Sequence, residues 1–136
     1  MVKKFTVLLY AAAATTLIAG ILHINRFIDT IRSGEQIGNP DILFLVGGIA
    51  QVFWVIPIIR QWGKIWYSIG IAGTAVFMLL WIITRLPENP ITGRAGPISG
   101  EGIIIQIFQI VFIVISTIFL INSTKAKNNS RIKDTC

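Results

Sequence analysis

The stretch that decides the fold is residues 42–84, which reads ILFLVGGIAQVFWVIPII (42–59), RQWGK (60–64) and IWYSIGIAGTAVFMLLWIIT (65–84). Neither apolar run contains a charged residue, and at ~1.5 Å per residue each approaches or matches the ~30 Å hydrocarbon core of a bilayer. The basic connection contains Trp62, and Trp66 and Tyr67 follow it, as is typical of a membrane–water interface. Gly63 can take the left-handed conformation that ends a helix. We therefore expect a transmembrane helical hairpin with a tight turn.

The composition of the whole chain supports a membrane protein. Of its 136 residues, 54% are hydrophobic and 13% are charged, and the mean hydropathy is +0.74. The formal net charge of +6 comes from Lys and Arg that lie at span ends and in the tail. Orientation in a membrane explains this charge better than nucleic acid does, so no nucleic-acid partner is expected. The single cysteine, Cys136, allows no internal disulfide.

Two further spans complete the predicted fold, at residues 5–24 and 102–121. A secretory signal peptide is the alternative for the first, but cleavage at Ala11–Ala14 would leave an apolar segment of residues 5–10, which is too short. We expect the first helix to continue at the interface as far as Gly34. The sequence therefore predicts an all-α, four-helix transmembrane bundle of up-down topology over residues 1–124.

The connections have clear compositional signals. Asn39 and Pro40 suit the N-cap and the first position of the second span. The segment 86–101 is rich in Pro and Gly, which predicts a turn-rich, ordered loop. Residues 125–136 form a polar, basic tail that we expect to be disordered.

The distribution of charge predicts the orientation. Eight of the 12 Lys and Arg residues lie before the first span, in the turn at 60–64 or in the tail, and four lie in the other two loops. Five of the six acidic residues lie on the opposite side, in or beside those two loops. The positive-inside rule then places both termini in the cytoplasm of a multi-pass cell-membrane protein.

Polar and small residues share one face of each predicted helix. At 100° per residue, Ala12, Thr16, Gly20 and His23 form such a stripe on the first span. The other three spans carry Gly47, Gln51 and Trp54; Tyr67, Gly70, Thr74, Trp81 and Arg85; and Gln106, Gln109 and Ser116. Amides and hydroxyls facing lipid would lack partners, so these stripes should meet inside the bundle.

The depth of these residues suggests a polar pocket that opens outward. His23 and Arg85 lie near the outer boundary, whereas Gln106 and Gln109 lie ~6 and ~11 Å inward from Gly102 along an ideal helix. Gln51 lies ~14 Å inward from Ile42, near the midplane. Intramembrane polar residues are functional candidates. The predicted pocket residues are His23, Gln51, Trp54, Trp81, Arg85, Gln106 and Gln109.

Structural roles are the alternative for each of these residues. His23 suits an interfacial hydrogen bond, and Arg85 suits an anchor that reaches the interface. Gln51 can join two helices, an interaction worth only ~0.6–2 kcal/mol, and Trp54 and Trp81 can serve packing alone.

The chemistry that the sequence lacks is also informative. One histidine and one tail cysteine do not form a structural zinc site or bis-histidine haem ligation, so neither a metal nor a cofactor is expected. Acidic loop residues could complete an oxygen-rich site with His23, but their spacing gives no specific support. Nucleotide-binding, hydrolase and metalloprotease motifs are missing, so no catalytic residue is assigned.

The chain resembles a group of small four-span integral membrane proteins of archaea, of the type found in ammonia-oxidising archaea. The resemblance rests on FLVGGIAQVFW (44–54), Ile56-Pro57, RQWG (60–63) and Thr84-Arg85, with NPITGR (89–94), Pro97-Ile98 and His23 fitting the same pattern. Relatives often carry an acid near the position of Gln106, where this chain has an amide. Because the group has no established activity, the resemblance implies a fold and a topology only.

Two functions of different classes remain open. The first is a non-enzymatic accessory or assembly subunit of a larger membrane complex, whose partners are lipid and other membrane subunits or further copies of the chain. Small size and absent catalytic motifs favour it, and dependence of such archaea on a multi-subunit membrane monooxygenase is compatible with it. The second is a binding or transport module for a small ligand that enters the polar pocket from outside. An enzyme of a DoxX-like redox type is a third alternative.

Overall fold

The computed structural model describes the backbone of residues 2–93 and 95–133, and the side chains of residues 6–93 and 95–122. Its regular structure over the described residues consists of four helices: α1 (Val2–Ser33), α2 (Asn39–Ile59), α3 (Lys64–Ile83) and α4 (Gly100–Lys133). Each contains a segment long and apolar enough to cross a membrane, namely residues 6–33, 39–59, 64–83 and 100–122. The prediction of an all-α fold with four candidate membrane spans is therefore confirmed.

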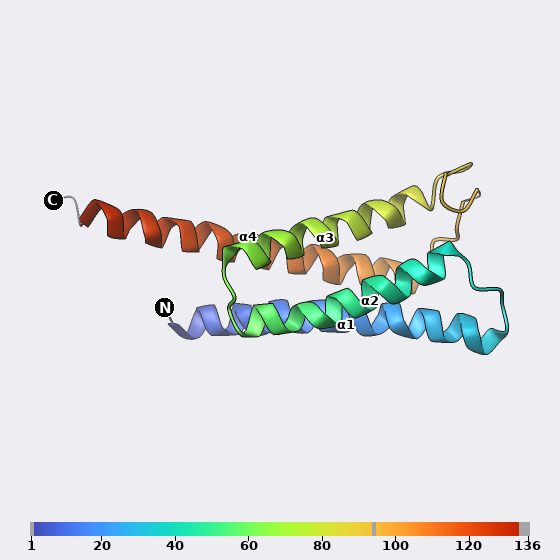
Figure 1. Ribbon diagram of the computed structural model, residues 1–136, viewed down its shortest axis with the longest axis horizontal. Coiled ribbons are helices and arrows are strands. Elements are labelled where there is room, and N and C mark those ends of the chain that lie inside the picture. Colours follow the sequence, from blue (N-terminus) through green and yellow to red (C-terminus); the bar gives the residue numbers. More distant parts are fainter. Residues whose placement is uncertain (1, 94, 134–136) are drawn as a thin grey trace.

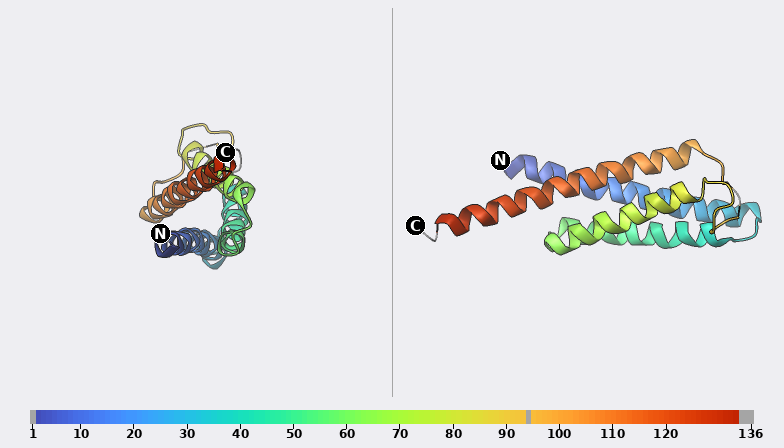
Figure 2. Two further views of the ribbon diagram at one scale, coloured as in Figure 1. Left: turned by 90° about the vertical axis from the view of Figure 1, so that its left-hand side faces the viewer. Right: turned by 90° about the horizontal axis from the view of Figure 1, so that it is seen from above.

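Neighbouring helices run in opposite directions (Figure 1). The start of α1 and the end of α4 lie at the same end of the molecule as the α2–α3 turn, which we call the hairpin end. The α1–α2 and α3–α4 connections lie together at the other end, which we call the loop end (Figures 1 and 2). In the described part, α1 contacts α2 and α4, and α3 contacts α2 and α4, so the helices surround one interior in chain order.

The α1–α2 connection is fixed by local backbone chemistry. Gly34 has a positive φ of 71° immediately after α1, which ends where the sequence predicts. The N-cap of α2 is Gly38, not Asn39 as predicted, and Asn39 is already helical. The physical reason is Asp41, whose Oδ2 accepts a hydrogen bond from the Gly38 N–H at 2.8 Å and so closes the first turn one residue earlier.

The turn at the hairpin end uses two residues with positive φ. Gln61 has φ of 50° and Gly63 has φ of 108°. The sequence predicts that Gly63 ends a helix in the left-handed conformation. Its φ is positive as expected, but with ψ of −179° it is the N-cap of α3, and Arg60 is the C-cap of α2. These two positive-φ residues, separated only by Trp62, let α3 begin a few residues after α2 ends.

An apolar core closes the hairpin half of the bundle. Its buried members are Leu9, Ala12, Ala13, Ile58, Tyr67, Phe112, Ile115 and Phe119. The Tyr67 and Phe119 rings stack with centroids 5.6 Å apart, and the Tyr67 hydroxyl donates to the Ile58 carbonyl at 3.4 Å. All four helices contribute to this core, which separates the interior from the hairpin end.

Small residues bring α1 and α2 into close contact near the middle of the bundle. A Cβ atom built on Gly48 would lie 2.8 Å from the Gly20 carbonyl oxygen and 3.1 Å from the Ile24 nitrogen. Both neighbours are backbone atoms, which side-chain motion does not move. The predicted stripe of small residues on α1 therefore packs inward.

The C-terminal boundary differs from the prediction. The sequence predicts a span that ends at residue 121 and a disordered tail from residue 125, whereas α4 continues as a helix to Lys133. No Gly or Pro follows Gly102, and Lys125, Ala126 and Lys127 favour helix, so nothing in the sequence stops α4 there. Residues 134–136 lie outside the described chain.

Candidate functional site

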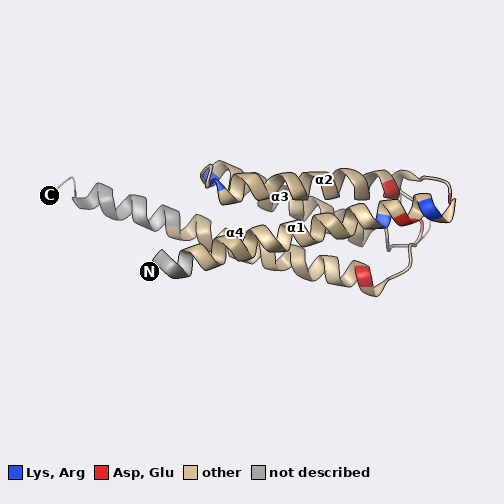
Figure 3. Ribbon diagram, turned by 90° about the horizontal axis from the view of Figure 1, so that it is seen from below, with Lys and Arg blue, Asp and Glu red and all other residues tan. Residues whose placement is uncertain are grey.

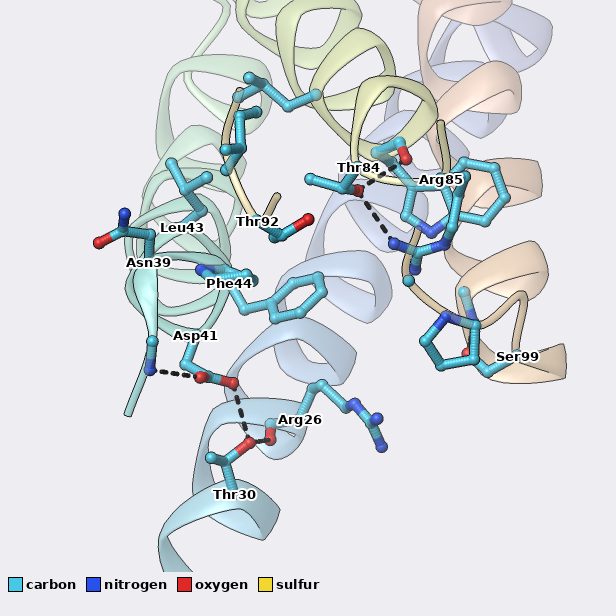
Figure 4. A pocket seen from close by; sticks show the side chains of 18 of the residues that line it. Arg26, Thr30, Asn39, Asp41, Leu43, Phe44, Thr84, Arg85, Thr92 and Ser99 are labelled. Atoms are coloured by element: carbon cyan, nitrogen blue, oxygen red, sulfur yellow. Dashed lines mark hydrogen bonds between the residues drawn. The ribbon is translucent and has the colours of Figure 1, made fainter. Parts of the chain in front are cut away.

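A cavity of about 700 Å³ lies at the loop end, and we call it the loop-end cavity. Residues of all four helices and of both connections line it, so it exists only in the folded bundle. Figure 4 shows the cavity from close by, with side chains from α1, α2 and the α3–α4 region directed around a common space. Its size is within the range of small-molecule sites.

Three of the seven predicted pocket residues line this cavity: His23 on α1, Trp81 on α3 and Arg85 just after α3. They are brought together from positions 58 or more residues apart in α1 and α3. His23 and Arg85 lie at the same end of the bundle, as expected from their predicted place at one common boundary.

His23 is held from two sides. It is 5% exposed, its ring stacks on Phe44 with centroids 5.5 Å apart, and its Nε2 lies 3.3 Å from Gln109 Nε2. An amide nitrogen can only donate, so His23 Nε2 is the acceptor. The other ring nitrogen, Nδ1, is buried and has no partner among the described residues.

Arg85 makes one hydrogen bond and one ring contact. Its Nη1 donates to Thr84 Oγ1 at 2.9 Å, and its guanidinium carbon lies 4.8 Å from the centre of the Trp81 ring. The Thr84 hydroxyl in turn donates to the Trp81 carbonyl at 2.8 Å. This second hydrogen bond orients the hydroxyl oxygen that accepts from Arg85. Burial, with a further contribution from the positive charge of Arg26, lowers the pKa of Arg85.

Gly96 and Gly102 make room for this arrangement. A Cβ on Gly96 would lie 2.9 Å from Arg85 Nη1, and a Cβ on Gly102 would lie 2.9 Å from Trp81 Nε1. The α3–α4 loop also pairs with the end of α3, because the Gly96 N–H donates to the Thr84 carbonyl at 2.8 Å. The described part of the loop thus packs against Thr84 and Arg85 through Gly96.

Two of the three carboxylates that line the cavity, those of Asp41 and Glu101, already have partners. Asp41 Oδ2 accepts from Gly38, and Asp41 Oδ1 accepts from Thr30 Oγ1 at 2.9 Å. Glu101 Oε2 lies 3.9 Å from Arg26 Nη1. In Figure 4 the Asp41–Thr30 pair lies on one side of the cavity, and Arg85 and Ser99 lie on the opposite side. The Arg26 side chain extends away from Asp41, and the Phe44 ring lies between the two sides.

Gln51 and Gln109 lie deeper than the loop-end cavity. They line a narrow gap with Thr15, Thr16, Ala19, Thr74 and Phe112 that has no room for a water molecule. Thr16 Oγ1 donates to the Gln51 carbonyl at 3.1 Å, whereas the side-chain oxygens of Gln51 and Gln109 are buried without a partner. The polar stripes therefore meet at two levels: His23, Trp81 and Arg85 line the cavity, and Gln51 and Gln109 lie below it.

Two predicted pocket residues lie elsewhere. Trp54 packs near the hairpin end, where its Nε1 donates to the Trp66 carbonyl at 3.2 Å and its ring lies 5.7 Å from that of Trp66. Gln106 is half-buried and lines neither cavity nor gap. Helical periodicity placed both on the inward stripe, but Trp54 packs against Trp66, and Gln106 stays partly exposed although its neighbour Ile105 lines the cavity.

Several cavity residues were missed by the sequence analysis, notably Arg26, Thr30, Phe44 and Glu101. A signal for two of them was present, since Arg26 and Thr30 continue the stripe of Thr16, Gly20 and His23 at spacings of three and four. Glu101 was considered only as one of the acids that could complete an oxygen-rich site with His23, and Phe44 carried no comparable signal because it looks like an ordinary residue near a helix start.

No group of three His, Cys, Asp or Glu side chains within residues 6–93 and 95–122 is arranged to hold a metal ion. No protein-family model matches the chain, and no curated protein and no solved structure matches it. The resemblance to the archaeal four-span group stays a prediction.

Proposed function

We propose that this protein binds a small ligand in the loop-end cavity, from the side of the membrane on which the two loops lie. The observation that carries the proposal is the cavity itself: about 700 Å³, walled by all four helices and lined by both apolar and charged side chains. Large concave sites with a few convergent polar groups are the usual form of small-molecule sites.

The packing below the cavity supports binding more than passage through the bundle. The gap around Gln51 and Gln109 has no room for water, and the apolar core beyond it is formed by bulky side chains such as Phe112 and Phe119. A ligand that enters from the loop end therefore meets a closed floor. Transport would require these helices to move apart.

We further propose that the hairpin end faces the cytoplasm, so that the cavity opens outward. Figure 3 supports this orientation through its acidic residues, which lie toward the loop end only, whereas basic residues lie at both ends. Arg60 and Lys64 are the basic residues of the turn. The positive-inside rule places such a turn on the cytoplasmic side, and both termini with it.

A comparison of two tryptophan variants tests ligand binding. Leu80 lines the cavity, whereas its neighbour Leu79 is 57% exposed on the outer surface. We expect Leu80→Trp to fill part of the cavity and Leu79→Trp to leave it unchanged. Full-length protein would be purified from its native membrane, denatured, and the released small molecules identified by mass spectrometry.

The proposal predicts a small molecule that is released by the wild type and by Leu79→Trp but is depleted from Leu80→Trp. Circular dichroism and gel filtration would establish that both variants are folded. An identical set of molecules from all three proteins, or none from any of them, would contradict the proposal.

The accessory-subunit role stays a prediction beside this one. Its test is the migration of the protein from native membranes in blue-native electrophoresis, where comigration with larger proteins is expected. Migration only as a detergent-bound monomer would count against it. The two roles are compatible, because a ligand-binding subunit can also belong to a complex.

A further inference from the structure

Three buried nitrogen atoms of residues that line the loop-end cavity have no hydrogen-bond partner among the described residues. They are Arg85 Nε, Trp81 Nε1 and His23 Nδ1. A buried polar group without a partner costs free energy, so such groups need an explanation. Their common feature is that all three belong to residues that line one cavity.

The charges around Arg85 also indicate that an acceptor is missing from the described residues. Within the described residues, no carboxylate oxygen lies within 4.0 Å of its guanidinium, and the ion pairs found join Arg26 to Glu101 and Arg32 to Asp29. A partly buried cation without a counter-ion is unfavourable. Arg26 adds a second positive charge near it and so favours an anion there.

The acids of the cavity do not supply that anion. Asp41 is engaged by Gly38 and Thr30, on the side of the cavity away from Arg85 (Figure 4). Glu101 is engaged by Arg26, and Glu35 is exposed at the outer edge. The acceptor that Arg85 lacks therefore has to come from outside this part of the chain.

We propose that the ligand of the loop-end cavity is an organic anion whose carboxylate or phosphate oxygens accept hydrogen bonds from the Arg85 guanidinium. A planar guanidinium suits both groups because it donates two parallel hydrogen bonds. Phe44, Phe77, Leu80 and Ile105 line the same cavity and can contact an apolar body attached to the anion. This inference rests on the proposed function and adds the chemical class of the ligand.

Such an anion has two sources, a water-soluble molecule and a lipid headgroup, and matched probes distinguish them. The soluble probes are benzoate and phenyl phosphate, with benzyl alcohol and benzylamine as neutral and cationic counterparts. The lipid probes are phosphatidic acid and diacylglycerol, which differ by the phosphate. Binding to full-length, delipidated protein in detergent would be measured by equilibrium dialysis for the soluble probes and by native mass spectrometry for the lipids, with protein-free micelles as the blank.

Arg85→Gln and Arg32→Gln make a matched pair of variants, because Arg32 is an exposed arginine that does not line the cavity. We expect at least one anionic probe to bind the wild type and Arg32→Gln equally, and to bind Arg85→Gln about tenfold more weakly or worse, the effect of losing a charge-assisted hydrogen bond. Arg85→Lys keeps the positive charge but loses the two parallel N–H donors of the guanidinium. Its affinity for the anionic probe should therefore lie between those of the wild type and Arg85→Gln, and it gives a second measurement if Arg85→Gln does not fold.

The outcomes separate the two proposals. Benzyl alcohol or benzylamine binding as tightly as benzoate, without dependence on Arg85, would overturn the anion inference and leave the cavity as a ligand site. Anion binding that Arg85→Gln and Arg85→Lys do not change would also overturn it. Failure of every anionic probe to bind would overturn the inference, while the Leu80→Trp comparison judges the proposed function independently.

Discussion

Gln109 of α4 and His23 of α1 are 86 residues apart in the sequence, yet their Nε2 atoms lie 3.3 Å apart across the interior of the bundle. This contact joins the first helix to the last. It also sets the boundary between the loop-end cavity, which His23 lines, and the narrow gap that Gln109 lines. Polar groups on opposite helices thus have a structural role and define the floor of the site.

A double-mutant cycle over His23→Phe and Gln109→Leu measures this contact. We expect a coupling free energy of about 0.6–1.7 kcal/mol, the range seen for hydrogen bonds between membrane helices. The measurement is the free energy of unfolding in detergent micelles, by steric trapping or by SDS titration. Gln106→Leu is the matched control, because Gln106 is half-buried one turn earlier on the same helix and lines neither space. If the coupling free energy between His23→Phe and Gln106→Leu equalled that between His23→Phe and Gln109→Leu, the hydrogen bond between His23 and Gln109 would be contradicted.

Gly48→Ala should destabilise the bundle. The added methyl group meets the backbone of Gly20 at 2.8 Å, so α1 and α2 have to separate, which we expect to cost about 1–3 kcal/mol. Gly73→Ala is the control, since nothing lies within 4 Å of a Cβ at Gly73 and alanine favours helix. The free energies of unfolding of both variants would be compared with that of the wild type. Equal or greater stability of Gly48→Ala would refute the close contact.

Gly102→Ala should displace the Trp81 indole. The new Cβ would lie 2.9 Å from Trp81 Nε1, and the rigid ring has to move, whereas a Cβ at Gly100 meets nothing within 4 Å. The chain has four tryptophans, so a background with Trp54, Trp62 and Trp66 changed to Phe leaves Trp81 as the only emitter. We expect Gly102→Ala, but not Gly100→Ala, to shift the emission maximum of Trp81. Identical spectra would show that Gly102 does not hold the ring in place.

Cysteine labelling decides which end of the bundle faces outward. In a Cys136→Ser background, Ile98→Cys places a thiol in the α3–α4 loop, where Ile98 is 68% exposed, and Trp62→Cys places one in the hairpin turn, where Trp62 is 43% exposed. An impermeant maleimide should label Ile98→Cys in intact cells and Trp62→Cys only after permeabilisation. The reverse pattern would place the cavity on the cytoplasmic side.

Local features of the chain were predictable from the sequence because they depend on neighbours along the helix. Uninterrupted apolar runs predict the spans, Gly34 and the glycine of the turn predict the ends, and the three- and four-residue spacing of Thr16, Gly20 and His23 predicts an inward face. Two helix ends differ from their predicted positions. One was decided by a single hydrogen bond and the other by the lack of a residue that stops a helix. Asp41 moved the start of α2 to Asn39, and α4 continued to Lys133 because no Gly or Pro interrupts it.

Depth along a helix was a weaker guide to the site. His23, Trp81 and Arg85 reach the same cavity, but Gln51 and Gln109 form the gap below it, and Trp54 lies with Trp66 near the hairpin end. An inward position says only that a side chain faces other helices. Whether it meets open space or a packed neighbour depends on how closely those helices approach at that level.

The sequence by itself determined that four apolar helices suited to a membrane follow one another, and which face of each is polar, because hydrophobic periodicity is a property of one segment at a time. Only the tertiary structure decided which polar residues share a cavity. Its decisive features are the close contact of Gly20 with Gly48 and the seating of Trp81 and Arg85 against Gly102 and Gly96. These contacts join residues remote in the chain, and van der Waals packing between helices, rather than any local pattern, fixes them.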